Sequence, residues 1–162
     1  QSVLSVPTSV QTVSRIDLAG AIKSAWHRLG GDSNQDDSDL VTEGTAEIES
    51  DESLIEDLLT SLLDNSLRFR KPNESLSIHC KLTTSADTAT MKISDNGLGI
   101  DPERIDWSIE PFNRGHHQGG LGLGLSRCVC IAKTIGCQFQ IRSDGESGTT
   151  ALLSFPIKIK PN

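Results

Sequence analysis

The residues best suited to chemistry fall in three short segments, and the first surrounds Asn65. On a stretch predicted to be helical, Ser61, Asn65, Arg68 and Phe69 recur at i, i+4, i+7 and i+8, so they share one face. A neutral carboxamide oxygen such as that of Asn65 suits Mg²⁺, which also keeps waters and phosphate oxygens in its shell. Arg68 can reach a phosphate, and Phe69 can pack against a flat base. The competing interpretation is an ordinary amphipathic helix with a polar edge.

The second segment is Asp95-Asn96-Gly97-Leu98-Gly99, which follows a predicted strand. A carboxylate at the end of a strand can accept the exocyclic amine of adenine. Glycines at alternate positions let the backbone pass close to a ligand. The alternative for this segment alone is a plain Asp-Asn-Gly turn.

The third segment, Gly119 to Leu125, is rich in glycine and leads into a helix expected from Gly124. Free N–H groups and the positive end of a helix dipole favour phosphate there, although a flexible loop would have a similar composition. It lacks the Gly-Lys-Ser/Thr of a P-loop. A dinucleotide fingerprint would open the fold rather than lie near its end. In this order, the three segments predict an ATP site.

The remaining chain supplies the elements that position these residues. Asp17 is expected to cap a first helix that ends at Gly30, and Pro72 to stop a second. Apolar periodicity predicts helices at 51–70 and 124–135, with a short helix beginning at Asp101-Pro102. Alternation and turn residues predict strands at 40–42, 46–48, 75–83, 88–94, 137–142 and 149–157. The predicted fold is an α/β (α+β) two-layer sandwich, a mixed, mostly antiparallel sheet with helices packed on one face.

Composition limits the classes of partner. The chain has 162 residues, a formal net charge of -7 and no basic run, which argues against nucleic acid as a partner. With 35% hydrophobic and 4% aromatic residues, the core must be aliphatic. No apolar run approaches the roughly 18 residues that a membrane helix needs. Four cysteines without a C-x-x-C pair are expected to be free thiols of a cytoplasmic protein, with Cys128 in the core and Cys130 more accessible.

Together these segments resemble the catalytic, ATP-binding domain of sensor histidine kinases. That domain has the Bergerat fold, in a superfamily shared with DNA gyrase, the Hsp90 chaperones and mismatch-repair proteins. The resemblance runs from about Arg15 to Pro156. It includes Glu110–Gly115, which looks like the family's F box, and the closing Gly145–Thr150.

The resemblance implies roles for individual residues. Asn65 would be the Mg²⁺ ligand, Asp95 would bind the adenine amine, and Thr150 would support the adenine through water. Arg68 would contact phosphate, and Phe69 would flank the base. The remaining implied cofactor-binding positions are Gly97, Gly99 and Ile100 around the adenine, Phe112 and Arg114 in an ATP lid, and Gly120, Leu121, Gly122, Leu123, Gly124 and Leu125 at the phosphates.

One departure from the family bears on the reaction. Ser61 stands where histidine kinases usually have a second Asn, and where the gyrase and chaperone branches have a Glu that activates water. A serine cannot act as that base at neutral pH, so phosphoryl transfer is favoured over self-contained ATP hydrolysis. None of the four histidines lies in a phosphoacceptor motif. The acceptor is therefore expected on a separate dimerisation domain of a homodimeric parent, with a response regulator downstream.

The expected division is a linker remnant at 1–13, an ATP-binding domain at 14–158 and a tail at 159–162, monomeric by itself. Two other functions stay open. One is a stand-alone serine kinase of the anti-sigma-factor type, which shares the fold. The other is a degenerate docking module without turnover, favoured by Ser61 and by the short lid between Phe112 and Gly120.

Overall fold

The structure is a computed structural model that describes residues 12–31, 38–100 and 121–157. Of residues 121–124 it describes the backbone alone.

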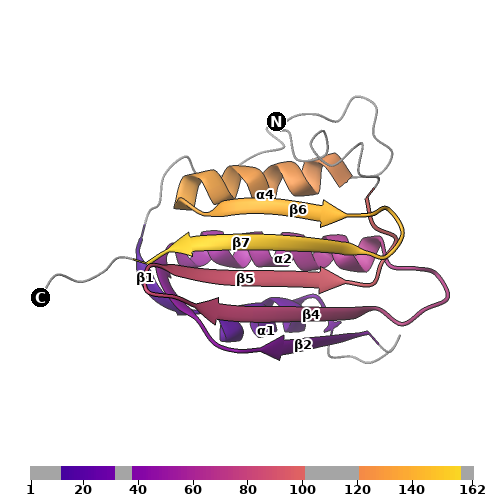
Figure 1. Ribbon diagram of the computed structural model, residues 1–162, viewed down its shortest axis with the longest axis horizontal. Helices are drawn as coiled ribbons and strands as arrows, with labels where there is room; N and C mark the ends of the chain where they lie inside the picture. The colour runs from indigo at the N-terminus through magenta and orange to yellow at the C-terminus, as the bar shows by residue number, and fades with distance from the viewer. Residues whose placement is uncertain (1–11, 32–37, 101–120, 158–162) are drawn as a thin grey trace, which may run out of the picture.

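The described residues form helices layered on one face of a sheet (Figure 1). The strands are β1 (Ser14–Asp17), β2 (Asp39–Glu43), β3 (Glu47–Ser50), β4 (Ser77–Thr84), β5 (Thr88–Asp95), β6 (Gln138–Ser143) and β7 (Thr149–Pro156). The helices are α1 (Leu18–Arg28), α2 (Glu52–Arg68) and α4 (Leu121–Ile135).

Two sheets are present in this described part. The main one has five strands in the order β2-β4-β5-β7-β6, and only β2 and β4 pair in parallel. The other pairs β1 with β3 antiparallel. The β5–β7 pairing brings distant parts of the chain together and sets Ser94 opposite Thr150.

Carboxylates begin the first two helices. Asp17 accepts a hydrogen bond from the backbone N–H of Ala19 at 3.2 Å, and Asp51 accepts one from Leu54 at 3.2 Å. Each satisfies an N–H group that the helix itself leaves unpaired. The predicted cap at Asp17 is therefore confirmed.

An aliphatic core fills the space between the helices and the sheet. Helix α2 contributes the largest share, and six of its side chains are at most 5% exposed: Leu54, Ile55, Leu58, Leu59, Leu62 and Leu63. Alternate residues of the strands face them, as the period of two requires. Those strand residues are Ile78, Cys80, Leu82, Ala89, Met91, Ile93, Ala151, Leu153 and Phe155.

Three of the four cysteines belong to this core. Cys80, Cys128 and Cys137 are buried and Cys130 is half-buried, all as free thiols. Burial raises the pKa of Cys80 and of Cys137 to about 12, and it raises the pKa of Cys128 as well. The prediction that Cys128 lies in the core is confirmed.

The predicted sandwich is confirmed, with two differences in its elements. Strand β1 occupies Ser14–Asp17, which the sequence did not predict as a strand because a four-residue strand gives almost no periodic signal. Helix α4 begins at Leu121 rather than at Gly124. Glycine disfavours a helix by only about 1 kcal/mol, so the apolar spacing of Leu121 and Leu125 extends the helix through the glycines.

The short helix expected at Asp101-Pro102 lies outside the described residues, and the division at 1–13 and 159–162 stays a prediction. Among the helices of the described ranges, none combines the length and apolarity needed to cross a bilayer.

Candidate nucleotide-binding site

A pocket opens between helices α2 and α4 and the sheet. The empty space among its lining residues, open solvent included, is about 480 Å³. Its walls are mainly apolar, with few polar groups. The residues that line it are Leu62, Asn65, Ser66, Phe69, Ile93, Asp95, Gly99, Ile100, Leu125, Ile141, Thr149 and Ala151.

The polar centre of the pocket is the Asp95 carboxylate, at the end of β5. Its Oδ1 accepts backbone N–H bonds from Gly97 at 2.9 Å and Thr149 at 3.1 Å. Its Oδ2 accepts the Ser66 hydroxyl at 2.7 Å. A carboxylate has about four acceptor sites, so these three donors fix its orientation and leave capacity at Oδ2. An amine that enters the pocket can bind there.

Two glycines allow the backbone to approach this carboxylate closely. A Cβ at Gly97 would lie 2.7 Å from the Phe69 carbonyl oxygen. A Cβ at Gly148 would lie 1.9 Å from the Asp95 carbonyl oxygen, and Gly148 also has a φ of +106°. Neither position admits a side chain without a shift of backbone. The N–H of Leu98 donates to the Phe69 carbonyl at 2.8 Å, which ties this loop to the end of α2.

Ser143 joins the same loop to the turn between β6 and β7. Its Oγ accepts the N–H groups of Ile100 at 2.8 Å and Gly145 at 3.1 Å. It donates to the Gly148 carbonyl at 2.7 Å. The half-buried Ser143 hydroxyl therefore connects the pocket residue Ile100 to the segment whose Thr149 N–H binds Asp95.

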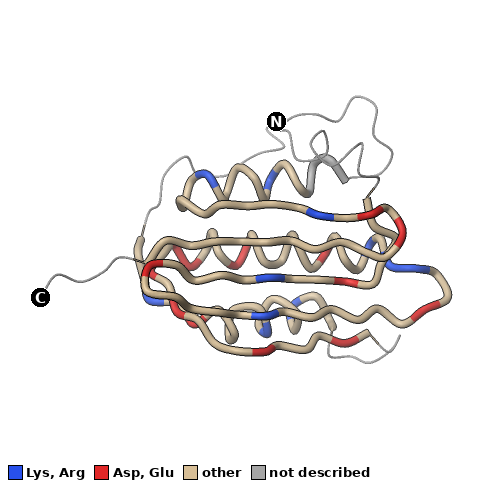
Figure 2. Tube along the Cα trace, in the orientation of Figure 1, with Lys and Arg blue, Asp and Glu red and all other residues tan. Residues whose placement is uncertain are grey.

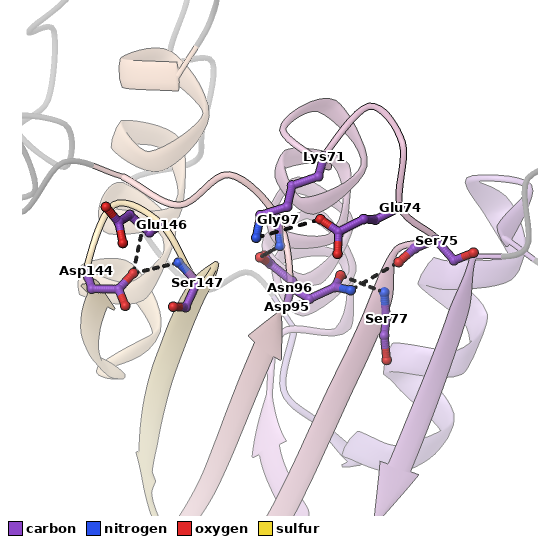
Figure 3. A network of polar contacts seen from close by, with 10 residues as sticks. All are labelled: Lys71, Glu74, Ser75, Ser77, Asp95, Asn96, Gly97, Asp144, Glu146 and Ser147. Atoms are coloured by element: carbon purple, nitrogen blue, oxygen red, sulfur yellow. Dashed lines mark hydrogen bonds and ion pairs between the residues drawn. The ribbon is translucent and has the colours of Figure 1, made fainter.

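Asn96 points toward Ser75 and Ser77 and holds the start of β4 (Figure 3). Its Oδ1 accepts the Ser77 N–H at 2.9 Å, and its Nδ2 donates to the Ser75 carbonyl at 3.0 Å. Close to it, Lys71 and Glu74 form an ion pair at 3.8 Å (Figure 3). The two neighbours in the chain thus have separate tasks, since Asp95 faces the pocket and Asn96 anchors the adjacent strand.

The structure brings most of the predicted residues that it describes to one place. Asn65, Phe69, Asp95, Gly99, Ile100 and Leu125 all line the pocket. Gly97 is buried beside it. Leu121, Gly122, Leu123 and Gly124 form the first turn of α4. Phe112, Arg114 and Gly120 lie outside the described residues.

Arg68 does not line the pocket. Its guanidinium pairs with Asp64 at 3.2 Å, one turn earlier on α2, and its side chain is 55% exposed. Helical spacing put Arg68 on the Asn65 side, but the last turn of the helix gives its long side chain a carboxylate partner at the surface. Its role toward phosphate stays a prediction.

Thr150 does not line the pocket, and its role toward adenine stays a prediction. Its hydroxyl lies 3.1 Å from that of Ser94, across the β5–β7 pair. Strand alternation puts both hydroxyls on the sheet face opposite Ile93 and Ala151, which line the pocket. Thr149 lines the pocket instead. The inward alternation of Ala151, Leu153 and Phe155, counted back along the strand, would have identified Thr149.

Ser66 was the other missed residue. Its side chain is small and 7% exposed, which lets α2 lie close to the sheet. Its hydroxyl also orients Asp95. Its position directly after Asn65 was the available signal.

A metal in this site would depend on the carboxamide. Within the described ranges, no group of three or more His, Cys, Asp or Glu side chains could hold a metal ion. Asn65 lines the pocket with a neutral oxygen, which fits Mg²⁺ when phosphate oxygens and water supply the other ligands.

Comparison with known proteins agrees with the fold and the pocket. Residues 50–159 match the family described as histidine kinase-, DNA gyrase B-, and HSP90-like ATPase. The autoinducer 2 sensor kinase/phosphatase LuxQ of Vibrio parahaemolyticus is 30% identical over 125 residues, which are 72% of this chain and 14% of LuxQ. The sensor protein SrrB of Staphylococcus aureus is 32% identical over 107 residues, 63% of this chain and 18% of SrrB. The chain thus spans less than a fifth of these relatives.

Solved structures share the fold. The mycobacterial sensor histidine kinase MprB has a TM-score of 0.75 at 20% identity, with 90% of this chain and 97% of that chain covered. The catalytic domain of the histidine kinase ThkA has a TM-score of 0.76 at 19% identity, with 90% and 98% covered. The match over residues 50–159, which hold every described residue of the pocket, shows that this chain belongs to the histidine kinase-, DNA gyrase B- and HSP90-like ATPase family.

Proposed function

We propose that this domain is the ATP-binding catalytic domain of a two-component sensor histidine kinase. It would bind ATP in the pocket between α2 and α4 and deliver the γ-phosphoryl group to a histidine on a separate dimerisation domain. The observation that carries the proposal is the Asp95 carboxylate, fixed by three donors with acceptor capacity left in an apolar pocket. The relatives LuxQ and SrrB are named as a sensor kinase/phosphatase and a sensor protein, which supports the kinase over other family branches.

The pocket divides into an adenine end and a phosphate end. At the adenine end, Asp95 would accept the exocyclic amine while Phe69 and Ile100 pack against the ring. At the phosphate end, Asn65 would hold Mg²⁺, which when bound would neutralise charge on the phosphates. Backbone N–H groups in the first turn of α4 would face the phosphates, because a helix leaves its first N–H groups unpaired. The structural relative ShkA was solved in complex with AMPPNP, an ATP analogue.

Transfer, rather than hydrolysis, is the proposed reaction. Ser61 lies one turn before Asn65 on α2, and its hydroxyl is no general base for water at neutral pH. Catalysis by the domain would then consist of positioning ATP and balancing its charge. The proposed partners are the dimerisation and phosphoacceptor domain of a homodimeric, cytoplasmic parent, and a response regulator that takes the phosphoryl group from it.

The first test is calorimetric titration of the chain with a non-hydrolysable ATP analogue, with and without Mg²⁺. Mg²⁺ should strengthen binding in the wild type. Asn65→Ala should reduce the Mg²⁺-dependent affinity by about tenfold or more, because loss of a residue that only orients a metal ligand already lowers metal affinity by about that factor. The matched control is Asn73→Ala, at an exposed position outside the pocket, which should leave the affinity unchanged. Equal affinities for wild type and Asn65→Ala in Mg²⁺ would refute the assignment.

The second test concerns the acceptor. Full-length protein incubated with γ-labelled ATP should carry acid-labile, base-stable phosphate, as expected of phosphohistidine. Phosphoserine on a partner protein would instead identify the serine kinase. Tight ATP binding without any phosphorylated product would identify the docking module.

A further inference from the structure

Helices α2 and α4 are joined by an ion pair away from the adenine end of the pocket. The Arg127 Nε donates to Asp57 Oδ1 at 3.0 Å and to Oδ2 at 3.1 Å, and Nη2 donates to Oδ2. The guanidinium thus grips the carboxylate with two nitrogens, a directional arrangement that a lysine could not reproduce. Both side chains are partly buried, with 29% and 31% exposed. Hydrogen bonding to Asp57 raises the pKa of Arg127 further.

The pair lies on the two helices that border the proposed phosphate end. Asp57 precedes Asn65 on α2 by just over two helical turns, so the two positions lie on adjoining faces of the helix. Arg127 comes within one turn of Gly124 and next but one to Leu125, which lines the pocket. The ion pair therefore connects the helix of the proposed metal ligand to the glycine-rich turn at the start of α4.

The surrounding contacts between these helices are mostly apolar. Among the described side chains of α4, the buried ones are Leu125, Ser126, Cys128, Ile131 and Ala132, and of these Ser126 alone is polar. The hydrophobic contribution of such packing is non-directional, whereas the Asp57–Arg127 ion pair is directional. The two glycines in the first turn of α4 weaken that turn further.

A partly buried ion pair is a poor source of net stability, because desolvation of both charges offsets their attraction. Such a pair can instead favour one alignment over others, since a shift by one residue breaks all three hydrogen bonds. We propose that Asp57 and Arg127 are positioning residues that fix α4 on α2 and so hold the phosphate-binding turn at a set distance from Asn65. This inference rests on the proposed ATP site.

A different role for Arg127 would be direct contact with a phosphate. The two roles predict opposite effects of Asp57. If Arg127 touches phosphate, removal of its carboxylate partner frees a cation and keeps or raises the affinity for ATP. If the pair positions α4, loss of either partner weakens ATP binding equally, and loss of both adds little.

The experiment measures the affinity of the chain for a non-hydrolysable ATP analogue with Mg²⁺ and for adenosine. The variants are Asp57→Asn, Arg127→Met and the double variant. Each single change should lower the affinity for the analogue by about threefold to tenfold, and the double variant should bind no more weakly than the weaker of the two single variants. Adenosine affinity should change by less than about twofold, because the adenine end lacks contact with either residue. Circular dichroism tests whether each variant folds. If Arg127→Met does not fold, Arg127→Lys replaces it, because lysine keeps the positive charge but cannot bind the carboxylate through two nitrogens.

The neighbouring pair Arg28–Glu56, which joins α1 to α2 at 3.8 Å, provides the matched control. Glu56→Gln should leave both affinities unchanged. Three outcomes would each overturn the positioning role. The first is unchanged affinity of Arg127→Met for the analogue, and the second is an equal loss of affinity for analogue and adenosine. The third is wild-type affinity in Asp57→Asn together with a loss of affinity in Arg127→Met. Failure of the wild-type chain to bind the analogue would refute the proposed function itself, and so is distinguishable from these outcomes.

Discussion

At the scale of single residues, the site depends on how Asp95 is held. Two backbone N–H groups and one hydroxyl bind the carboxylate, and they come from three parts of the chain: the loop after β5, the start of β7 and helix α2. A charged acceptor of several hydrogen bonds is held in one orientation. A carboxylate held in this way suits recognition of an amine, and it repels the carbonyl oxygen that guanine has at the same position.

Replacement of this acceptor should therefore change which base binds. Asp95→Asn should abolish the preference for adenine over guanine nucleotides, with a loss of about tenfold to a hundredfold in affinity for ATP. That size corresponds to the roughly 1.5–3 kcal/mol that a hydrogen bond to a charged group contributes. Competition titrations with ATP and GTP analogues measure it.

Ser66→Ala is the graded comparison. It removes one orienting donor and keeps the carboxylate, so adenine should still be preferred while affinity falls by less than in Asp95→Asn. Retained discrimination in Asp95→Asn would show that another group reads the base.

At the scale of elements, the Asp144 carboxylate stabilises the turn between β6 and β7. Asp144 Oδ1 accepts the N–H groups of Glu146 at 2.8 Å and Ser147 at 2.7 Å (Figure 3). These bonds lower the pKa of Asp144 from 3.8 to about 2. The same turn places Gly148 and the Thr149 N–H against Asp95, so local turn chemistry and the site are connected.

The lowered pKa predicts how this turn responds to acid. Because the folded-state pKa lies below the unfolded-state value, ionised Asp144 stabilises the fold fully above about pH 4. That contribution is lost as the pH falls from about 4 through about 2. The difference in Tm between wild type and Asp144→Ala should accordingly be largest at neutral pH and fall to a small part of that value near pH 2. Glu146→Ala, in the same turn but with its backbone N–H retained, serves as control; a difference in Tm as large at pH 2 as at neutral pH would contradict the assignment.

Sequence alone predicted these elements well where a periodic or capping signal existed. Asp17, the apolar stripe of α2 and the alternation of β4 and β5 each follow from local chemistry. Strand β1 was missed because it is short. The parallel pairing of β2 with β4 was also beyond reach, since it depends on long-range contacts.

The site was predicted less evenly. Asn65, Asp95 and the pocket glycines stand in recognisable segments. Ser66 directly follows Asn65 and Thr149 lies within Gly145–Thr150, but neither was singled out from the sequence. Both reach the site because α2 and β7 converge on the end of β5. Arg127 likewise looked like any polar residue of an amphipathic helix until the structure brought Asp57 to it.

At the scale of the whole molecule, the core is aliphatic, and acidic and basic positions are scattered along the described chain (Figure 2). Figure 2 shows acidic and basic positions dispersed among the helices and strands, without a continuous basic stripe in the described part. That distribution agrees with the net charge of -7 and with a small-molecule ligand rather than a nucleic acid.

The core should dominate the free energy of unfolding. Leu58, at the centre of α2, is 0% exposed, and Leu58→Ala should lower the free energy of unfolding by about 2–5 kcal/mol through lost burial and a residual cavity. Leu98 is 46% exposed, so Leu98→Ala should change it by less than about 1 kcal/mol. Urea denaturation at constant pH measures both. Similar losses in the two variants would mean that the core is not packed as described.

The bond from Thr149 to Asp95 links residues 54 positions apart. On the ribosome, the segments around Asn65 and Asp95 and the glycines of α4 all emerge before β7 does. The nascent chain would thus contain those three segments and still lack the Thr149 N–H, the third donor that binds the Asp95 carboxylate. If Asp95 binds adenine as proposed, a chain that ends before β7 would lack the Thr149 donor and would have an incomplete site.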